Sequence, residues 1–321
     1  MQDFRGLSPR QARRGEARPA GRYNAGMTGL VLLGNRQALD PAQLGDKQDR
    51  LFRILRSCGK VLVAYSGGAD SAYLAWAARE VLGDNAIAVT ADSPSIPESH
   101  KRDAIAFAER YGIRHELIPS REFENPDYVA NNPDRCYHCK DELFRRMEQI
   151  APRYGGAVLV YGVNTDDLGD YRPGQFAARE HGVRAPLVEA GLRKAEIREL
   201  SRMAGLPTWD RPAAACLSSR VPYGTPVTPE ILRRVERAEE AIGELGFRQF
   251  RVRYHGEVAR LEIERSEMER ALSLEMFDRL AEVFREAGFL YSAIDLRGYR
   301  QGALNEALGG AAAGPGEKPS S

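Results

Sequence analysis

The fold of this chain is decided by one stretch, Val61-Leu62-Val63-Ala64-Tyr65-Ser66-Gly67-Gly68-Ala69-Asp70-Ser71. Its apolar start predicts a buried strand, and the two glycines predict a tight turn. A helix is expected over 72–82, so that Asp70 and Ser71 lie at its beginning. Backbone N–H groups at Gly67 and Gly68 can come close to an anion, and the helix N-terminus adds partial positive charge. The stretch therefore predicts a phosphate-binding loop between a strand and a helix.

This loop has no lysine after its glycines, so the lysine geometry of a Walker A loop is not expected. Ser66 and Ser71 instead offer hydroxyl groups to phosphate oxygens. The pattern Ser-Gly-Gly-x-Asp-Ser after a strand resembles the PP-loop of ATP pyrophosphatases. That resemblance implies that the chain binds ATP, releases pyrophosphate and adenylylates a substrate. The alternative is an ordinary glycine turn.

Composition narrows the class of protein. The 321 residues include 46 Lys plus Arg and 45 Asp plus Glu, a net charge of +1, so nucleic acid is not the expected partner. No apolar stretch approaches the roughly 20 residues that span a bilayer, and no apolar core follows the N-terminal arginines as in a secretory signal. We therefore expect no membrane partner and a cytoplasmic location. In that reducing setting the four cysteines favour metal binding or catalysis over disulfides.

Strand and helix patterns alternate through the first two thirds of the chain. Strands are expected at 61–65, 86–91, 115–119 and 157–161, and helices at 72–82, 99–111, 139–150 and 194–204. This alternation predicts an α/β fold, a PP-loop domain whose parallel sheet is flanked by helices. We assign it to residues 27–224, after a disordered extension at 1–26 that is rich in arginine.

The pattern changes after Pro222-Tyr223-Gly224-Thr225-Pro226. A long helix at 229–245 is followed by two alternating strands that turn at Gly256, and then by a helix at 268–287 and a strand at 289–295. Residues 225–308 are therefore expected to form a smaller C-terminal α+β domain for substrate binding or oligomerisation. Residues 309–321 are expected to be disordered.

Three cysteines are spaced for a metal site. Cys136 and Cys139 form a C-x-x-C motif just before a predicted helix, and Cys216 follows 77 residues after Cys139. Three thiolates suit a [4Fe–4S] cluster with one iron open to a non-protein ligand. Three thiolates with His138 would instead suit zinc, and chemistry by unligated cysteines is a third possibility. Cys58 is expected to be a small buried side chain.

Several separate motifs, spread over about residues 50–300, resemble the LarE family of ATP-dependent sulfur transferases, which act in making the nickel-pincer nucleotide cofactor of lactate racemase. These are Ser-Gly-Gly-Ala-Asp-Ser at 66–71, Asn-Pro-Asp-Arg-Cys-Tyr-His-Cys-Lys at 132–140, Gly-Val-Asn-Thr-Asp-Asp at 162–167, Ala-Cys-Leu-Ser-Ser-Arg at 215–220 and Arg-Val-Arg-Tyr-His-Gly at 251–256.

The resemblance implies a substrate and a source of sulfur. The substrate is a pyridinium mononucleotide with carboxylates at ring positions 3 and 5, each converted to a thiocarboxylate. In the family, the residue that matches Cys216 carries the sulfur. One branch sacrifices that cysteine, whereas the branch with all three cysteines holds a [4Fe–4S] cluster. This chain resembles the second branch, which implies Cys136, Cys139 and Cys216 as ligands, with sulfide or a sulfur donor protein as partner. The family also suggests a homo-oligomer such as a hexamer.

The adenylylation step needs ATP and Mg²⁺, because a carboxylate has no good leaving group until AMP is attached. The expected ATP-binding residues are Ser66, Gly67, Gly68, Asp70, Ser71, Asp92 and Ser93. We expect Asp70 and Cys216 to be catalytic, although an Asp at a helix start is also a good cap. Asp166 and Asp167 follow the fourth strand, where α/β ligands gather, and Asp167 is a candidate for substrate contact.

The phosphate of the substrate needs cations. Arg251 and Arg253 project from one face of a strand, and guanidinium groups grip phosphate oxygens well. Ser219 and Arg220, close to Cys216, would bring that phosphate near the sulfur. A solvated edge strand, or pairing of these arginines with Glu262, is the alternative.

Three other functions compete. Some PP-loop enzymes that thiolate tRNA, of the 2-thiocytidine type, also combine a C-x-x-C with a distant cysteine. Amidation, as in NAD or GMP synthetases, gives no reason for three spaced cysteines. A non-enzymatic scaffold that binds ATP or zinc would not release pyrophosphate.

Overall fold

The computed structural model describes residues 39–169, 173–212, 215–300 and 302–304, which belong to one compact unit that begins at Leu39. The predictions made for residues 1–26 and 309–321 lie outside this range. Among the described residues, no helix is both long and apolar enough to cross a membrane.

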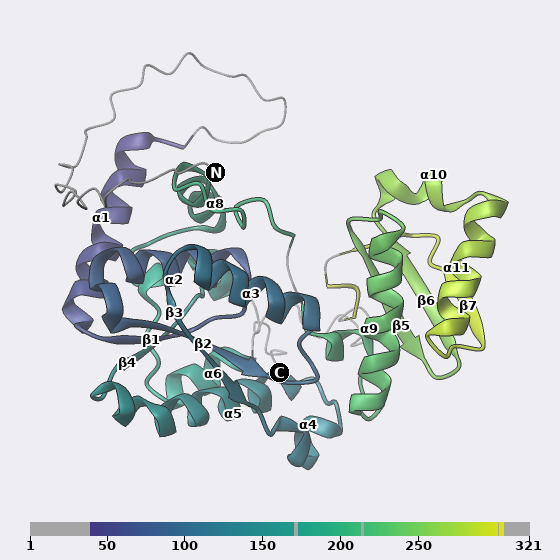
Figure 1. The fold of residues 1–321 in the computed structure, drawn as a ribbon, viewed down its shortest axis with the longest axis horizontal. Helices are drawn as coiled ribbons and strands as arrows, with labels where there is room; N and C mark the ends of the chain where they lie inside the picture. Colours follow the sequence, from purple (N-terminus) through teal and green to yellow (C-terminus); the bar gives the residue numbers. More distant parts are fainter. Residues whose placement is uncertain (1–38, 170–172, 213–214, 301, 305–321) are drawn as a thin grey trace, which may run out of the picture. The chain divides into compact units, whose positions relative to one another are not determined.

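The first sheet contains four parallel strands in the order β3-β2-β1-β4 (Figure 1). They are β1 (Val61–Ala64), β2 (Ala86–Asp92), β3 (Arg114–Pro119) and β4 (Val158–Tyr161). The predicted α/β class and the four predicted strands are therefore confirmed, with small shifts at their ends.

Eight helices of this part of the chain surround or extend the sheet within the described residues. They are α1 (Pro41–Cys58), α2 (Ala69–Leu82), α3 (Glu98–Arg110), α4 (Pro126–Val129), α5 (Arg135–Ile150), α6 (Pro173–Glu180), α7 (Pro186–Glu189) and α8 (Lys194–Met203). Of these, α5 begins earlier than the sequence pattern indicates, so the C-x-x-C motif lies inside the helix and not before it.

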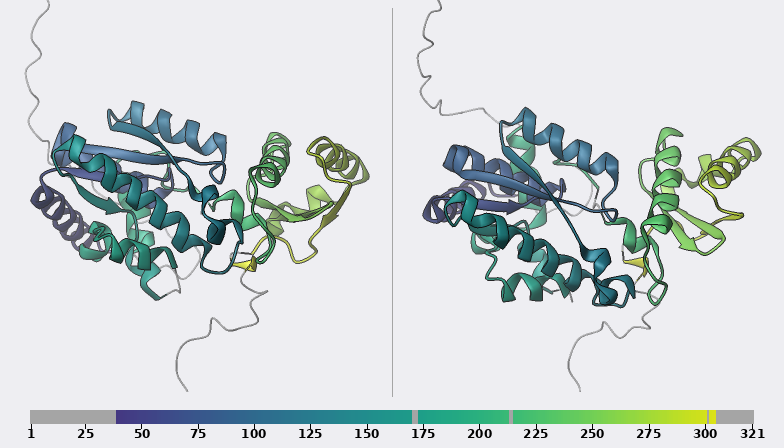
Figure 2. Two further views of the ribbon diagram at one scale, coloured as in Figure 1. Left: turned by 90° about the horizontal axis from the view of Figure 1, so that it is seen from below. Right: turned by 60° about the horizontal axis from the view of Figure 1, so that its bottom comes forward.

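Alternate residues of β1 enter two different hydrophobic cores. Val61 and Val63 pack with side chains of α1, α2, α3 and α8, whereas Leu62 and Ala64 pack with α5 and α6. Successive side chains of a strand point to opposite faces, so both faces of the sheet are buried. Figure 2 shows the helices on the two sides of the sheet.

The end of β4 approaches the first turn of α2 very closely. A Cβ atom built at Gly162 would lie 2.8 Å from the Cα and the N atom of Ser71. Only a glycine tolerates this contact, and it brings the loop after β4 beside the predicted phosphate-binding loop.

The C-terminal part contains a second sheet in the order β5-β6-β7. Its strands are β5 (Phe250–His255), β6 (Val258–Ile263) and β7 (Tyr291–Ile294), and its helices are α9 (Pro229–Glu244), α10 (Met268–Ala271) and α11 (Leu274–Glu286). The hairpin β5–β6 is antiparallel and turns at Gly256, as predicted, and β7 pairs with β6 in parallel.

The prediction of a single helix over 268–287 is wrong. Two helices occupy this range, and the break falls at Ser273, whose side chain accepts a hydrogen bond from the Met276 N–H and caps α11. Serine competes well for such a cap, and this ends the preceding helix. The predicted domain division at 224/225 stays a prediction, although Leu217 and Val221 already pack in the C-terminal core.

Candidate functional site

The loop between β1 and α2 has the geometry of a phosphate-binding turn. Gly67 adopts φ +73°, which a side chain disfavours, and Gly68 is the N-cap residue of α2. The Ser71 hydroxyl lies 3.1 Å from the Ser66 hydroxyl and donates to the Gly68 carbonyl at 3.1 Å. The two serine hydroxyls and the first N–H groups of α2 therefore meet at one point, where an anion is favoured.

Asp70 is not a helix cap, because no side chain caps α2. Its Oδ2 accepts a hydrogen bond from Lys194 Nζ at 2.7 Å and another from the Asn164 amide at 3.4 Å. Its Oδ1 is buried and has no hydrogen-bond partner among the described residues. A buried carboxylate oxygen without a partner has the chemistry to bind a hard cation such as Mg²⁺.

The two aspartates that follow β4 brace the same edge of the sheet. Asp167 Oδ2 accepts the Asn164 N–H at 3.1 Å, and Asp166 Oδ2 accepts the Lys194 N–H at 2.8 Å. They therefore orient the two residues that hold Asp70. This arrangement places Asp167 next to the loop but gives it a structural partner.

The residues predicted to hold adenosine lie at the end of β2. Asp92 accepts a hydrogen bond from Lys101 of α3 at 2.7 Å. Ser93 is buried, and its hydroxyl donates to Glu122, a carboxylate that also accepts the Ser95 hydroxyl at 3.1 Å. Burial raises the pKa of Glu122 above its ordinary value. The buried carboxylate of Glu122 thus fixes the turn after β2 through the hydroxyls of Ser93 and Ser95.

This turn is bonded directly to the segment that carries Cys216. The Leu217 N–H donates to the Ser95 carbonyl at 2.8 Å. Cys216 itself is the N-cap residue of a short 3₁₀ helix, Leu217–Arg220. The predicted sulfur carrier is therefore one residue away from a contact with the predicted nucleotide side of the sheet.

Contacts from α4 and α5 hold the same segment. The Tyr128 hydroxyl lies 2.8 Å from the Ser218 hydroxyl, and Arg135 donates to the Ser218 carbonyl at 2.9 Å. Arg135 immediately precedes Cys136 in the first turn of α5. These contacts bring the C-x-x-C motif toward Cys216.

The three thiols influence one another electrostatically. Cys136 is exposed on one side, but the atoms packed around its thiol raise its pKa, and nearby Cys216 raises it further. Burial also raises the pKa of Cys139, with contributions from Glu122, Cys216 and Cys136. The thiols are thus within electrostatic range of one another, but within the described residues no three His, Cys, Asp or Glu side chains are arranged to hold a metal ion.

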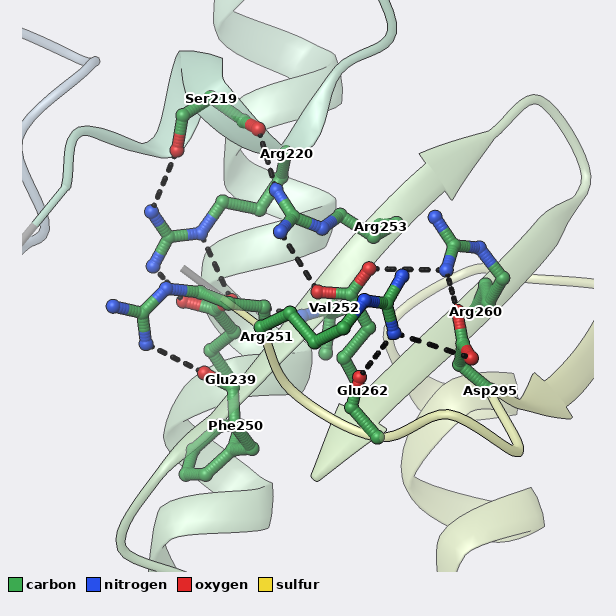
Figure 3. Close-up of polar contacts among 12 residues, drawn as sticks. Ser219, Arg220, Glu239, Phe250, Arg251, Val252, Arg253, Arg260, Glu262 and Asp295 are labelled. Atoms are coloured by element: carbon green, nitrogen blue, oxygen red, sulfur yellow. Dashed lines mark hydrogen bonds and ion pairs between the residues drawn. The ribbon is translucent and has the colours of Figure 1, made fainter. Parts of the chain in front are cut away.

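The predicted phosphate-binding residues form a network of buried charges, drawn in Figure 3. Arg220 is buried and makes a two-pronged ion pair with Glu239 of α9, at 3.0 and 2.8 Å. Its remaining nitrogen donates to the carbonyls of Ala215 and Cys216 at 2.8 and 2.9 Å and to the Ser219 hydroxyl. Arg220 therefore fixes the backbone beside the sulfur.

The second half of this network lies on the hairpin. Arg253 donates to the Ser219 carbonyl at 2.8 Å and to Glu262 at 2.7 Å, and Arg260 donates to Glu262 at 3.0 Å. The pairing with Glu262 that the sequence left open is therefore present. Burial and the charge of Arg220 lower the pKa of Arg251, so the cations crowd together here.

His100 of α3 lies among these cations and was not singled out by its sequence context. Its pKa is lowered to about 4 by burial and by the charges of Arg211, Arg220 and Arg251, against which Glu239 acts. The imidazole is therefore neutral at neutral pH. A concentration of positive charge beside a neutral ring suits an anionic ligand.

The sequence gives no sign of four further residues of the site, which are Lys194, Arg211, Glu122 and Glu239. Lys194 reaches Asp70 across 124 positions of the chain, and Glu239 reaches Arg220 across 19. No local pattern marks such partners, because their position depends on which strands lie side by side.

Comparison with known proteins finds relatives that cover most of this chain. Residues 52–144 match the family described as NAD synthase. An uncharacterized protein of Synechocystis is 44% identical over 265 residues, which are 83% of this chain and 99% of the relative. The pyridinium-3,5-bisthiocarboxylic acid mononucleotide synthase of Lactiplantibacillus plantarum is 35% identical over 269 residues, 83% of this chain and 96% of the relative. A probable tRNA sulfurtransferase of Methanobrevibacter smithii is 26% identical over 57% of this chain and 49% of its own.

Proposed function

This chain belongs to the LarE family of PP-loop, ATP-dependent sulfurtransferases, and from that premise we propose how its residues divide the reaction. The substrate is a pyridinium-3,5-dicarboxylate mononucleotide on the route to a nickel-pincer nucleotide. A carboxylate oxygen bonds to the α-phosphorus of ATP, and the bond from that phosphorus to the bridging oxygen breaks. Pyrophosphate leaves with the electron pair. Sulfur then replaces AMP to give the thiocarboxylate.

One observation carries this proposal. The hydrogen bond from the Leu217 N–H to the Ser95 carbonyl joins the residue after Cys216 to the turn after β2. Adenylylation and sulfur transfer must occur at the same carbonyl carbon, so the nucleotide and sulfur segments have to be adjacent. The relation to the tRNA sulfurtransferase is distant, with 26% identity over 57% of this chain, and it does not favour RNA as the substrate.

The loop residues Ser66, Gly67, Gly68 and Ser71 hold the phosphates of ATP in this proposal. Asp70 holds Mg²⁺, which is supported by its partnerless buried oxygen. Mg²⁺ supplies charge stabilisation to the departing pyrophosphate. Asp92 and Ser93 face the nucleoside, and Lys194 keeps Asp70 oriented.

Arg251 and Arg253 bind the phosphate of the mononucleotide in this proposal, with Ser219 and Asp167 as further contacts. Arg220, whose donors already meet Glu239 and two carbonyls, serves instead to position the backbone of Cys216. The pKa of His100 is lowered partly by the positive charges of Arg211, Arg220 and Arg251. That concentration of positive charge supports the binding of an anion at this place.

Cys136, Cys139 and Cys216 hold a [4Fe–4S] cluster in this proposal, which is supported by the residue type, since such clusters take thiolate ligands, and by the effect of each thiol on the pKa of another. When bound, the cluster would keep an inorganic sulfur ligand on its open iron, supplied by sulfide or a donor protein.

We also propose a homo-oligomer, which the exposed apolar side chains Leu274, Leu290 and Leu296 support. Light scattering after gel filtration measures its size.

The function is tested by pyrophosphate release. We expect release from ATP and Mg²⁺ that depends on the pyridinium dicarboxylate mononucleotide, and a thiocarboxylate product when sulfide is supplied. Release that is the same with and without the mononucleotide would contradict the proposal.

The cluster is tested separately by anaerobic purification. We expect about four irons per chain, as in a [4Fe–4S] protein, and loss of iron in the Cys136→Ala and Cys139→Ala variants. Cys58→Ala, outside the thiol group, should keep its iron. Stoichiometric zinc without iron would show the cluster assignment to be wrong.

A further inference from the structure

The ATP loop lacks a cation of its own, but the structure brings one to it from elsewhere. Arg211 lies in the segment between α8 and Cys216, and its Nη1 donates to the Gly67 carbonyl at 2.8 Å. A Cβ atom at Gly67 would lie 3.6 Å from this nitrogen. A guanidinium group is therefore in contact with the turn whose N–H groups are expected to receive phosphate.

Three further contacts hold Arg211 in place. Its second terminal nitrogen pairs with Asp103 of α3. Its own carbonyl accepts a hydrogen bond from Arg198 of α8 at 2.8 Å, and its N–H donates to the Thr208 carbonyl at 3.2 Å. The guanidinium group is thus presented to the loop by a backbone that is itself anchored.

Arg211, which contacts the Gly67 carbonyl, is also close to Cys216 in the sequence. It lies five residues before Cys216, and the Leu217 N–H meets the turn after β2 on the other side of that cysteine. Arg211 and Leu217, on the two sides of Cys216 in the sequence, therefore both contact the predicted nucleotide side of the sheet. Trp209, two residues before Arg211, is 41% exposed.

We propose that Arg211 binds the polyphosphate of ATP, and that it thereby makes formation of the adenylate depend on the position of the Cys216 segment. Negative charge grows on the leaving pyrophosphate as the α-phosphorus bond breaks, and a guanidinium group held beside the loop stabilises it. Arg211 exchanges its bond to the Gly67 carbonyl for phosphate oxygens when ATP binds. This inference rests on the proposed function only in its use of ATP.

Nucleotide binding tests the contact without any substrate or cluster. Arg211→Met should weaken binding of α,β-methylene-ATP by about tenfold or more, the usual effect of losing a hydrogen bond to a charged group, and should leave AMP binding unchanged. Arg110→Met, an arginine at the end of α3 away from the loop, is the matched control and should bind both nucleotides as wild type. Equal weakening of ATP and AMP, or no weakening, would overturn the proposal.

Two further variants guard against a folding defect. Arg211→Lys keeps the charge without the planar fork, so its preference for ATP over AMP should fall between wild type and Arg211→Met. Asp103→Asn removes the competing carboxylate and should strengthen ATP binding. An Arg211→Lys protein that distinguishes the nucleotides as poorly as Arg211→Met would also speak against a charge contact.

The proposed coupling between ATP binding at Arg211 and the position of Cys216 is tested by a separate measurement. In wild type, α,β-methylene-ATP should change the rate at which iodoacetamide alkylates Cys216, measured by mass spectrometry of the cluster-free protein. In Arg211→Met the rate should be the same with and without saturating nucleotide. Persistence of the effect in that variant would separate ATP binding from the segment and refute the coupling. Failure of the thiolation assay alone would leave both nucleotide results intact.

Discussion

Several buried charges near the predicted phosphate site have partners of opposite charge. Glu262 is fully buried between Arg253 and Arg260, and Arg220 is buried against Glu239. A buried ion pair gives little net stability, but removing one partner leaves an uncompensated charge. These residues therefore set the shape of the phosphate site more than the stability of the fold.

Glu262→Gln tests this view at a single residue. Loss of the carboxylate leaves Arg253 without its buried partner and should lower the free energy of unfolding by about 3 kcal/mol, measured by urea denaturation. Glu257→Gln, at the exposed turn of the same hairpin, should change it by less than about 0.5 kcal/mol. Equal stability of the two variants would mean that Glu262 is not paired in solution.

At the scale of elements, the site depends on how closely β4 approaches α2. Gly162→Ala forces a methyl group into the Ser71 backbone and should cost about 1–3 kcal/mol of stability. It should also reduce the thermal shift that ATP produces, because the first turn of α2 is displaced. Melting curves with and without ATP measure both effects.

Gly45→Ala is the matched substitution. Gly45 lies within α1 and a Cβ atom there meets nothing within 4 Å, so the change should stabilise the helix by roughly 0.5–1 kcal/mol and leave the ATP shift unaltered. If both substitutions behaved alike, the contact between β4 and α2 would not be the cause.

The helix that bears the C-x-x-C motif is fastened to α6 by a titratable group. His181, just after α6, lies 2.9 Å from both Asp141 and Glu148 of α5. Burial alone would lower the pKa of His181, but these two carboxylates outweigh it and raise the pKa above its ordinary value. Its contribution to stability is therefore complete below the unfolded pKa, near 6.5, and is lost as the pH rises through the folded value.

His181→Ala should accordingly cost about 1 kcal/mol at pH 5.5 and almost nothing at pH 9, measured by chemical denaturation across that range. His255→Ala is the comparison. Burial and Arg260 lower the pKa of His255, so its removal should become less costly, not more, as the pH falls. A cost of His181→Ala that does not vary with pH would exclude the charged pair.

At the scale of the whole molecule, the residues after Cys216 connect the C-terminal core with helices α4 and α5. Leu217 and Val221 pack in the C-terminal core, while Ser218 is bonded to Tyr128 and Arg135. We expect the slowest amides of β1 and β6 to exchange with deuterium at the same free energy, through one global opening. A β6 that exchanges at a lower free energy than β1 would support independent domains divided near 224/225.

The sequence predicts most of the fold because its signals are local. Two glycines after an apolar run mark the loop, and alternation over 250–263 marks the hairpin. The break at Ser273 was missed because a cap competed with an unbroken helical pattern. Lys194 and Arg211 were missed because both reach the loop from far along the chain, and only the order of the strands brings them there.

The partial exposure of Trp209 has a practical use. This indole lies two residues from a guanidinium group that, on our proposal, changes partners when nucleotide arrives. The only other tryptophan, Trp76, lies in the middle of α2. The enzyme therefore carries its own optical reporter, and a stopped-flow trace of its emission would reveal how fast Arg211 changes partners once the nucleotide arrives.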